Sequence, residues 1–297
     1  MRISLNKGNK LMDVITQKIS DGIVITLHQP SGAGRKPVII LCHGFCGIRE
    51  ILLPAFADAF ARAGFAAITF DYRGFGDSDG ERGRLVPAMQ IADILAVVRW
   101  ARQQPELDAQ RIGLWGTSFG GCHVFGAAAE APEIKCIVSQ LAFADGEAIV
   151  SGQMNEEEKQ AFIATLDKMA EKQKNSGKEM MVSVNRVLSD AESKAFFAEN
   201  RTLYPKMDIK IPFLTVRETL QYKPASYAAQ VKCPTLVVIA GKDTVNPPEQ
   251  GRALFAAIGA PEKKLYEQAD ARHYDIYTGA HFGQVIRVQT EWFEKYL

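Results

Sequence analysis

A serine held between glycines, at the junction of an apolar run and a run of small residues, is the feature that most limits the fold of this chain. The junction reads Gly-Thr-Ser-Phe-Gly at residues 116–120, with an apolar run at 111–115 before it and small residues at 121–129 after it. The first run indicates a buried strand and the second a closely packed helix. At such a turn the serine hydroxyl is exposed, and the helix N–H groups can bind an anion. The pattern predicts a nucleophile at Ser118.

A second match to the same pattern lacks this context. Gly-Asp-Ser-Asp-Gly at 76–80 trails the apolar run at 66–70 by several residues and is followed by charged residues, not a helix. Two aspartates beside Ser78 would oppose the oxyanion that acyl transfer must stabilise. We interpret Ser78 as part of a solvated turn. For Ser118, the alternative is an ordinary helix N-cap.

Strand-like and helix-like segments alternate along most of the chain. Apolar, β-rich runs occupy residues 38–41, 67–70, 111–115, 134–138, 235–240 and 264–267, with helical patterns between most of them. This alternation predicts an α/β fold with a mainly parallel, twisted sheet and helices on both faces. Residues 14–19 and 22–28 predict an antiparallel hairpin at the sheet edge.

The alternation stops between residues 146 and 222, where the pattern is helical and charged with no convincing buried strand. Asn155 with Glu158, and Ser189 with Glu192, fit helix capping boxes. We predict a helical cap at 146–222, inserted between two parts of an α/β core at 1–145 and 223–297. The Met and Phe residues of the cap predict a small core of its own, and four residues are candidates for an apolar acyl pocket: Met154, Phe162, Met180 and Met181.

The charge balance argues against two classes of partner. The chain has 35 Lys and Arg against 34 Asp and Glu, so no net field attracts nucleic acid or an anionic membrane. No run approaches the roughly 18 apolar residues that cross a bilayer, and residues 1–10 lack the apolar segment of a secretory signal. We expect a cytoplasmic protein with a small-molecule substrate. A homodimer through an exposed face of the cap is left open.

The cysteines indicate neither disulfides nor a metal site. The five cysteines are an odd number, and most of them lie in or beside apolar strands, as small buried residues do. Cys42-His43-x-x-Cys46 supplies at most three ligands on one tight loop, with no second cluster to complete a tetrahedral site. We therefore expect no metal and no cofactor.

A serine nucleophile needs a base, and the base needs a third group to orient it. Of the five histidines, His28 falls on the edge hairpin, where we expect a solvated side chain. His123 lies inside the helix after Ser118, and His281 lies at the start of the last helix, where we expect a cap or surface role. His273 occupies a loop after the last strand, where a sheet of this kind presents functional groups. This elimination predicts His273 as the base.

The acid is expected at the end of a neighbouring strand. Asp243 directly follows the apolar run at 235–240, and the chain order Ser118, Asp243, His273 is the order expected for this architecture. The alternative is that Asp243 caps the helix that begins near residue 247. Asp145, after the preceding strand, is the second candidate acid. Asp275 lies too close to His273 in sequence to orient it easily, and we expect it to cap the final helix.

Two backbone donors are predicted to bind the negative oxygen of a tetrahedral intermediate. One is the N–H of Phe119, next to the nucleophile. The other is the N–H of Phe45, in the glycine-rich loop His-Gly-Phe-Cys-Gly at 43–47, where the backbone can approach a ligand closely. His43 is then expected to support this loop through its ring nitrogens and not to transfer protons.

Together these motifs resemble the α/β-hydrolases. The resemblance rests on His-Gly-Phe at 43–45, Asp-Tyr-Arg-Gly-x-Gly-x-Ser at 71–78, the turn at 116–120, Gly241-x-Asp243 and His273, and it covers about residues 12–145 and 223–297. The insertion, the pair at 49–50 and residues 273–277 look closest to a capped bacterial esterase-like branch. That branch also resembles fungal polyketide acyltransferase relatives and the dipeptidyl-peptidase and cocaine-esterase group. The resemblance implies serine-dependent acyl transfer without a metal or organic cofactor.

The leading hypothesis for function is a carboxylic-ester hydrolase, with an acyl-enzyme on Ser118, His273 as base and acid, and Asp243 orienting His273. A thioesterase or an acyltransferase acting on a bulky, polyketide-like metabolite is the alternative, because a cap that excludes water favours another acceptor. C–C bond hydrolases and peptidases can use the same residue set and remain alternatives. A non-enzymatic binding protein is a further hypothesis, against which the complete residue set argues.

Overall fold

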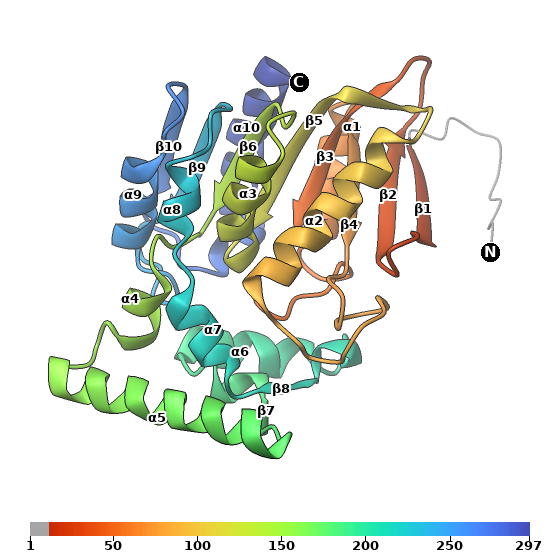
Figure 1. Ribbon diagram of the computed structural model, residues 1–297. Helices are drawn as coiled ribbons and strands as arrows, with labels where there is room; N and C mark the ends of the chain where they lie inside the picture. The colour runs from red at the N-terminus through yellow and green to blue at the C-terminus, as the bar shows by residue number, and fades with distance from the viewer. Residues whose placement is uncertain (1–11) are drawn as a thin grey trace.

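The structure is a computed structural model that describes residues 12–297. A twisted sheet of eight strands runs through the molecule and carries helices on both faces, which confirms the predicted α/β fold (Figure 1). Residues 1–10, whose composition predicts no secretory signal, lie outside the described range. None of the helices in that range is long and apolar enough to span a membrane.

The strands of the sheet follow the order β1-β2-β4-β3-β5-β6-β9-β10. Their bounds are β1 (Met12–Lys18), β2 (Val24–Pro30), β3 (Lys36–Cys42), β4 (Ala66–Phe70), β5 (Leu107–Thr117), β6 (Cys136–Gln140), β9 (Thr235–Ala240) and β10 (Lys263–Gln268). β1 pairs with β2 in an antiparallel hairpin at the edge of the sheet, as predicted, and β2 pairs antiparallel with β4. All the pairs from β4 to β10 are parallel, so the carboxyl ends of these strands meet at one edge of the sheet.

Two helical layers cover the sheet. α1 (Leu53–Arg62) and α10 (Gly279–Tyr296) pack on one face, and the other face carries α2 (Pro87–Arg102), α3 (Phe119–Glu130), α8 (Pro224–Ala228) and α9 (Pro248–Ala257). Each layer closes its own apolar core, one around Phe56 and Trp115 and the other around Ile91 and Phe125. The central strands are therefore buried on both sides, which explains why their sequences are apolar without alternation.

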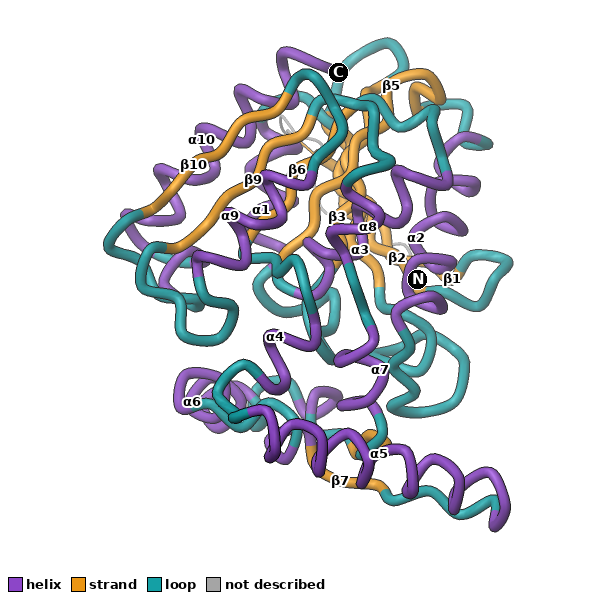
Figure 2. Tube along the Cα trace, turned by 60° about the vertical axis from the view of Figure 1, so that its left-hand side comes forward, coloured by secondary structure: helices purple, strands orange, loops and turns teal. Residues whose placement is uncertain are grey.

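The segment at 146–222, here called the insertion, lies at the carboxyl-end edge of the sheet (Figures 1 and 2). Its elements are α4 (Gly146–Ser151), α5 (Glu156–Ser176), β7 (Met181–Ser183), the 3-10 turn η1 (Val184–Arg186), α6 (Ala191–Asn200), the 3-10 turn η2 (Pro205–Met207), β8 (Lys210–Pro212) and α7 (Thr215–Gln221). The insertion has a small core, but Leu166, Val216 and Leu220 form its centre, with Phe162 and Phe213 packed against it. The prediction that Met and Phe residues build this core is therefore met only in part, because several of them line the pocket instead.

Two details of the insertion differ from the sequence prediction. The sequence showed no convincing buried strand here, yet β7 and β8 form a short antiparallel pair, in which β7 is largely exposed. The capping box at Asn155 and Glu158 is confirmed. The one at Ser189 is wrong: Asp190 is the N-cap of α6, and its carboxylate accepts the Ser193 N–H. Both residues are good N-caps, so their order along the chain did not decide which one starts the helix.

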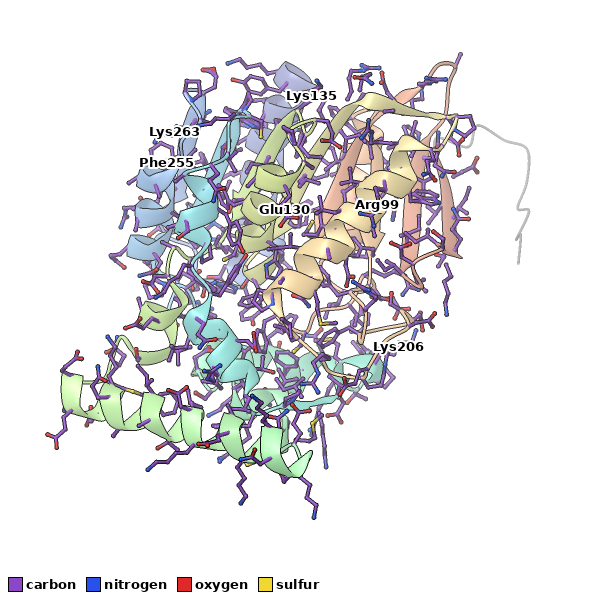
Figure 3. The ribbon with its side chains drawn as sticks, viewed as in Figure 1. Arg99, Glu130, Lys135, Lys206, Phe255 and Lys263 are labelled. Carbon is purple, nitrogen blue, oxygen red and sulfur yellow. The ribbon has the colours of Figure 1, made fainter. Side chains whose placement is uncertain are left out.

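Ion pairs join the insertion to the loops beside the sheet. Arg84, after β4, contacts Glu179 with nitrogen–oxygen distances of 2.5–2.7 Å. Lys206 of the insertion, labelled in Figure 3, lies 3.0 Å from a carboxylate oxygen of Glu50 and 2.8 Å from one of Asp77. These contacts hold the insertion over the carboxyl ends of the strands, where the predicted functional residues lie.

Candidate active site

Ser118 lies on a strained turn between β5 and α3. Its backbone has φ 53° and ψ −121°, a conformation that residues other than glycine rarely adopt. A Cβ at Gly116 would lie 2.2 Å from the Gly120 carbonyl oxygen, and one at Gly120 would lie 2.2 Å from the Cys42 carbonyl oxygen. Glycine is therefore required on both sides of the serine, which confirms the close backbone approach predicted from the sequence.

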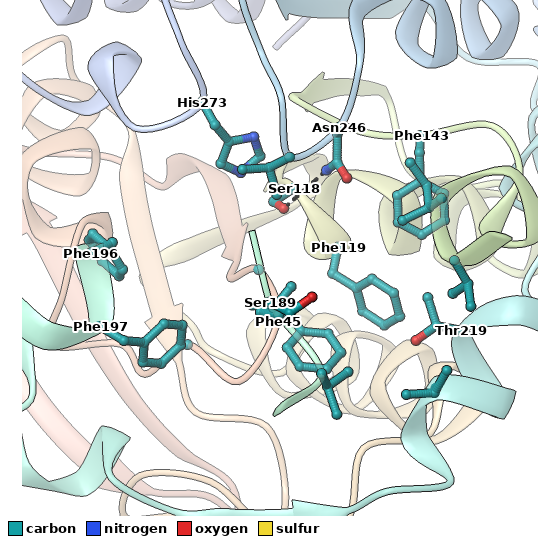
Figure 4. Close-up of a pocket in the computed structure, with 18 of the residues that line it drawn as sticks. Phe45, Ser118, Phe119, Phe143, Ser189, Phe196, Phe197, Thr219, Asn246 and His273 are labelled. Carbon is teal, nitrogen blue, oxygen red and sulfur yellow. Dashed lines mark hydrogen bonds between the residues drawn. The ribbon is translucent and has the colours of Figure 1, made fainter. Parts of the chain in front are cut away.

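Asp243 and His273 form a buried pair at the ends of β9 and β10. Nδ1 of His273 lies 2.7 Å from Oδ2 of Asp243, and the two residues are 2% and 5% exposed. Because a carboxylate only accepts, Nδ1 carries the hydrogen and Nε2 is left as the acceptor of the neutral ring. In Figure 4 the imidazole lies beside Ser118. The structure thus brings together the three residues that the sequence singled out from three distant segments.

The other oxygen of Asp243 is also occupied. Oδ1 accepts the backbone N–H groups of Val245 and Asn246, both at 2.8 Å. These bonds close a tight turn after β9 and fix the direction of the carboxylate. The alternative that Asp243 caps the following helix is wrong, because Pro247 is the N-cap of α9 and receives no side-chain hydrogen bond. The Asp243 side chain closes the turn before that helix and contacts the histidine.

Asn246 is a site residue that the sequence analysis missed. Its side chain is buried, and Nδ2 lies 3.3 Å from Ser118 Oγ and 2.8 Å from the Leu141 carbonyl oxygen (Figure 4). The signal available in the sequence was its position three residues after Asp243, in the loop that follows a core strand.

The two residues whose backbone N–H groups are the predicted donors, Phe45 and Phe119, line the same pocket as Ser118. Their rings meet edge to face with centroids 5.5 Å apart. Within residues 12–297, neither backbone N–H donates a hydrogen bond to a protein atom. The Phe45 loop passes close to the nucleophile, because a Cβ at Gly44 would lie 3.1 Å from Cβ of Ser118. Both N–H groups are therefore available to a ligand.

His43 supports the Phe45 loop, as predicted. Nδ1 accepts the Gly44 N–H at 2.7 Å, so Nε2 carries the hydrogen and donates to the Ile51 carbonyl oxygen at 3.0 Å. The ring packs against Gly47, where an added Cβ would lie 1.8 Å from Nδ1. Burial lowers the pKa of His43 to about 4, which keeps the ring neutral at pH 7.

The other candidate acids have different roles. Asp145 is the N-cap of α4, accepting the Glu147 N–H at 2.8 Å, and pairs with Lys223 at 2.5 Å. Asp275 pairs with Arg272, and the prediction that it caps the final helix is wrong, since Thr278 precedes α10. Neither acid lines the pocket.

Three predicted side-chain environments need comment. His28 is buried and not solvated, because helix α1 packs over β2 on that face of the sheet. Ser78 is also buried, which corrects the predicted solvated turn: its hydroxyl donates to the Asp71 carbonyl oxygen at 2.6 Å and accepts the Val24 N–H at 2.8 Å. His281 is partly buried and contacts the Gln268 amide at 2.8 Å.

His123 is built into the core. Its ring nitrogens contact the Tyr222 hydroxyl at 2.9 Å and Gln90 Oε1 at 2.8 Å, and burial lowers its pKa to about 3. Burial raises the pKa of the Cys42 and Cys46 thiols, which disfavours their thiolate forms. In the described part of the chain, no group of three or more His, Cys, Asp or Glu side chains is placed to hold a metal ion.

A pocket of about 370 Å³ lies between the sheet edge and the insertion. Ser118, His273 and Asn246 line it, and the insertion contributes apolar side chains that include Met154, Phe162, Phe196, Phe197, Phe213 and Val216. Of the four candidates for the acyl pocket, Met154 and Phe162 line it, whereas Met180 and Met181 are exposed and outside it. Of the Asp, Glu, Lys and Arg residues in the described chain, Arg186 alone lines this pocket. Within residues 12–297 it has no ion-pair partner.

Helix α6 of the insertion touches the neighbours of both Asp243 and His273. The Phe196 ring stacks on Tyr274, which follows His273, with centroids 4.4 Å apart and planes 12° from parallel. The Ser193 and Tyr274 hydroxyls lie 3.2 Å apart. Thr244, which follows Asp243, donates to Glu192 at 2.5 Å. Helix α6 therefore contributes to the pocket wall and also contacts the residues that follow Asp243 and His273.

Comparison with known proteins gives a family match over most of the chain. The model described as the alpha/beta hydrolase fold matches residues 37–280. In the solved structure of the DcsB complex with its substrate analogue, the matching chain has a TM-score of 0.82 and 25% identity, over 96% of this chain and 100% of that one.

Three curated relatives cover nearly the whole chain. An uncharacterized 31.7 kDa protein of the traX-finO intergenic region of Escherichia coli is 65% identical over 96% of this chain and 100% of its own. The quorum-quenching protein AidA of Acinetobacter baumannii is 30% identical, over 91% and 90%. The thiohydrolase aneE of Aspergillus aculeatus is 27% identical, over 93% and 91%.

Proposed function

Because the chain belongs to the α/β-hydrolase family, we propose that it is a serine hydrolase that cleaves carboxylic esters through an acyl-enzyme on Ser118. One observation carries the proposal: the Ser118 hydroxyl shares an apolar pocket with the imidazole of a buried His273–Asp243 pair. A serine hydroxyl is a weak nucleophile, and a positioned neutral imidazole is the base that activates it.

The proposed reaction has two halves. Ser118 Oγ attacks the ester carbonyl carbon while its proton passes to Nε2 of His273, and the tetrahedral intermediate collapses by releasing the alcohol, which takes that proton. Water then attacks the acyl-enzyme and gives a proton to the same Nε2. The bond between the acyl carbon and Oγ breaks, Ser118 regains its proton, and the carboxylic acid leaves. Asp243 stabilises the imidazolium that forms in each half.

The negative oxygen of each intermediate is assigned to the N–H groups of Phe45 and Phe119. Both groups lack a protein acceptor within residues 12–297, and both residues line the pocket beside Ser118. A donor that is already fixed before the reaction costs no reorganisation when charge develops. The His43 contacts with Gly44 and Ile51 support this fixed geometry.

The pocket lining favours an apolar acyl group. The insertion supplies aromatic and aliphatic walls, including Phe162, Phe196 and Phe213, and burying such a group against them is favourable by about 25 cal/mol for each Å² removed from water. The pocket volume of about 370 Å³ falls within the range of small-molecule sites.

A second candidate keeps the acyl-enzyme and changes the substrate to a thioester, or the acceptor to another alcohol or amine. The observation that favours it is the relative named a thiohydrolase, at 27% identity over 93% of this chain. The insertion also contributes apolar walls to the pocket, and a site that excludes water favours an acceptor other than water.

The test is intact-mass labelling with a fluorophosphonate, together with hydrolysis of p-nitrophenyl esters from acetate to decanoate. Wild type should gain one phosphonyl group, and Ser118→Ala should gain none and lose ester turnover. The matched control is Ser189→Ala, which alters another pocket serine, labelled in Figure 4, and should label normally. Labelling of Ser118→Ala at the wild-type rate would refute the assignment.

Two further assays separate the candidates. Labelling at Ser118 without ester turnover would move the assignment to thioesters, to be tested with acyl-thioesters of matched chain length. Product analysis with added alcohols or amines reports transfer, and hydrolysis that no acceptor diverts would refute the transferase alternative.

A further inference from the structure

We infer that Asn246 is a further catalytic residue, whose side-chain amide holds the Ser118 hydroxyl so that its hydrogen points toward His273. The inference rests on the proposed function, because it concerns the nucleophile of that reaction. It starts from one contact: Nδ2 of Asn246 lies 3.3 Å from Ser118 Oγ, across 128 positions of the chain.

The Asn246 side chain is fixed from two directions. Its backbone N–H donates to Asp243 Oδ1 at 2.8 Å, in the turn closed by the acid of the buried pair. Its side-chain nitrogen donates to the Leu141 carbonyl oxygen at 2.8 Å, just beyond the end of β6. Leu141 itself is held by its N–H bond to Val238 of β9, also at 2.8 Å. With 6% of the residue exposed, the amide has little freedom to turn away.

These contacts also determine which end of the amide faces the serine. A carbonyl oxygen only accepts, so the group beside Leu141 O must be the NH₂. One of its two hydrogens binds that carbonyl, and the other is directed at Ser118 Oγ. The amide therefore acts on the serine as a donor, and it carries no charge that would compete with the developing oxyanion.

A donor in this position restricts the serine hydroxyl. The hydroxyl has one hydrogen to donate and two lone pairs to accept with. When Asn246 occupies a lone pair, the hydrogen is left for another acceptor, which we assign as Nε2 of His273, the ring beside Ser118 in Figure 4. The attack on the substrate then begins from an oriented hydroxyl, and orientation of the reacting groups is a direct source of rate.

The same residue has a plain structural reading, in which it only ties the turn after β9 to the end of β6. Gln250 offers a matched control for that reading. Its Oε1 accepts the N–H groups of Ala144 at 3.2 Å and Asp145 at 3.1 Å, so it anchors the same segment after β6 without a contact to Ser118. A purely structural role predicts similar losses on replacing either residue.

The experiment compares wild type with Asn246→Ala and Gln250→Ala. The measurements are the second-order rate of fluorophosphonate labelling, and kcat and KM for p-nitrophenyl butyrate. We expect Asn246→Ala to lower the labelling rate and kcat about tenfold, the size of effect that one hydrogen bond supplies, with KM within about twofold. Gln250→Ala should label and turn over within about twofold of wild type.

A second variant separates loss of the donor from loss of the side chain. Asn246→Asp keeps the shape of the side chain and replaces the donor by an acceptor, so at pH 8 it should lose at least as much labelling rate as Asn246→Ala. Labelling of both Asn246 variants within about twofold of wild type, or equal losses in Gln250→Ala, would overturn the inference. Failure of wild type itself to label at Ser118 would instead overturn the proposed function, so the two failures are distinguishable.

Discussion

Mild acid should destabilise this protein through His43, a histidine that the fold keeps neutral. Burial lowers the pKa of His43 from 6.5 to about 4. In the unfolded chain an imidazole takes up a proton as the pH falls below about 6.5, whereas the folded protein does not until about pH 4. Between these values the unfolded state binds more protons. The free energy of unfolding therefore falls as the pH is lowered through this window, and this contribution levels off below it.

The size of the effect follows from the same two values. One pKa unit corresponds to about 1.4 kcal/mol, so the full window from pH 6.5 to 4 removes about 3 kcal/mol of stability through this one residue. The residue is 5% exposed, so solvent screening takes little from this figure. Between pH 6.5 and 5 the loss should be about 2 kcal/mol.

The assay is urea unfolding of wild type and His43→Gln at pH 7.5, 6 and 5, followed by tryptophan fluorescence, to which the buried Trp115 contributes. We expect the variant to be less stable at pH 7.5, because a flexible amide replaces a rigid buried ring. Its loss of stability on going to pH 5 should nevertheless be smaller than that of wild type by about 2 kcal/mol.

The control is Gln250→Ala, which lowers stability without removing an ionisable group and should keep the wild-type pH dependence. Parallel pH dependence of wild type and His43→Gln would refute the reasoning. It would mean that the ring is not held neutral, and that its contacts with Gly44 and Ile51 are weaker than their distances imply.

Two further predictions concern the insertion. Phe196→Ala removes a stacked ring from Tyr274 and should lower kcat for p-nitrophenyl acetate about fivefold, since such a pair contributes about 1 kcal/mol. The control is Phe197→Ala, which removes a pocket ring without that stacking. Equal losses of kcat in the two variants would contradict a role for the stacked pair. Arg186→Gln should raise KM for a p-nitrophenyl hemiester that carries a carboxylate about threefold, the scale of an exposed ion pair, and leave KM for the neutral butyrate unchanged. A uniform change in both KM values would show that Arg186 does not select for charge.

The parts of the site that were predictable are those with a local cause. The turn around Ser118 is recognisable in the sequence, because a strand and a helix meet there with no room for a Cβ at Gly116 or Gly120. Asp243 and His273 lie in the loops that follow β9 and β10, so the parallel arrangement of the sheet brings them to one edge.

The parts that were missed depend on what lies across the fold. The Asn246 contact with Ser118 spans 128 positions, and a position three residues after Asp243 does not by itself distinguish this asparagine from a turn residue. β7 and β8 have three residues each, too few for a periodic pattern, and each forms because the other lies beside it. His28 and Ser78 look polar and exposed in sequence, but neighbouring strands and a turn enclose them.

Helix α6 contacts both the pocket and the residues that follow Asp243 and His273, and this affects how the substrate range can change in this lineage. Replacing Phe196 alters the shape of the pocket and at the same moment the surroundings of Tyr274, so selection for a new substrate there also disturbs the chemistry. Phe162 and Val216 line the same pocket but pack within the core of the insertion. Substitutions in α5 and α7 can therefore change the pocket lining without altering the surroundings of Tyr274, whereas exchanging α6 would change both.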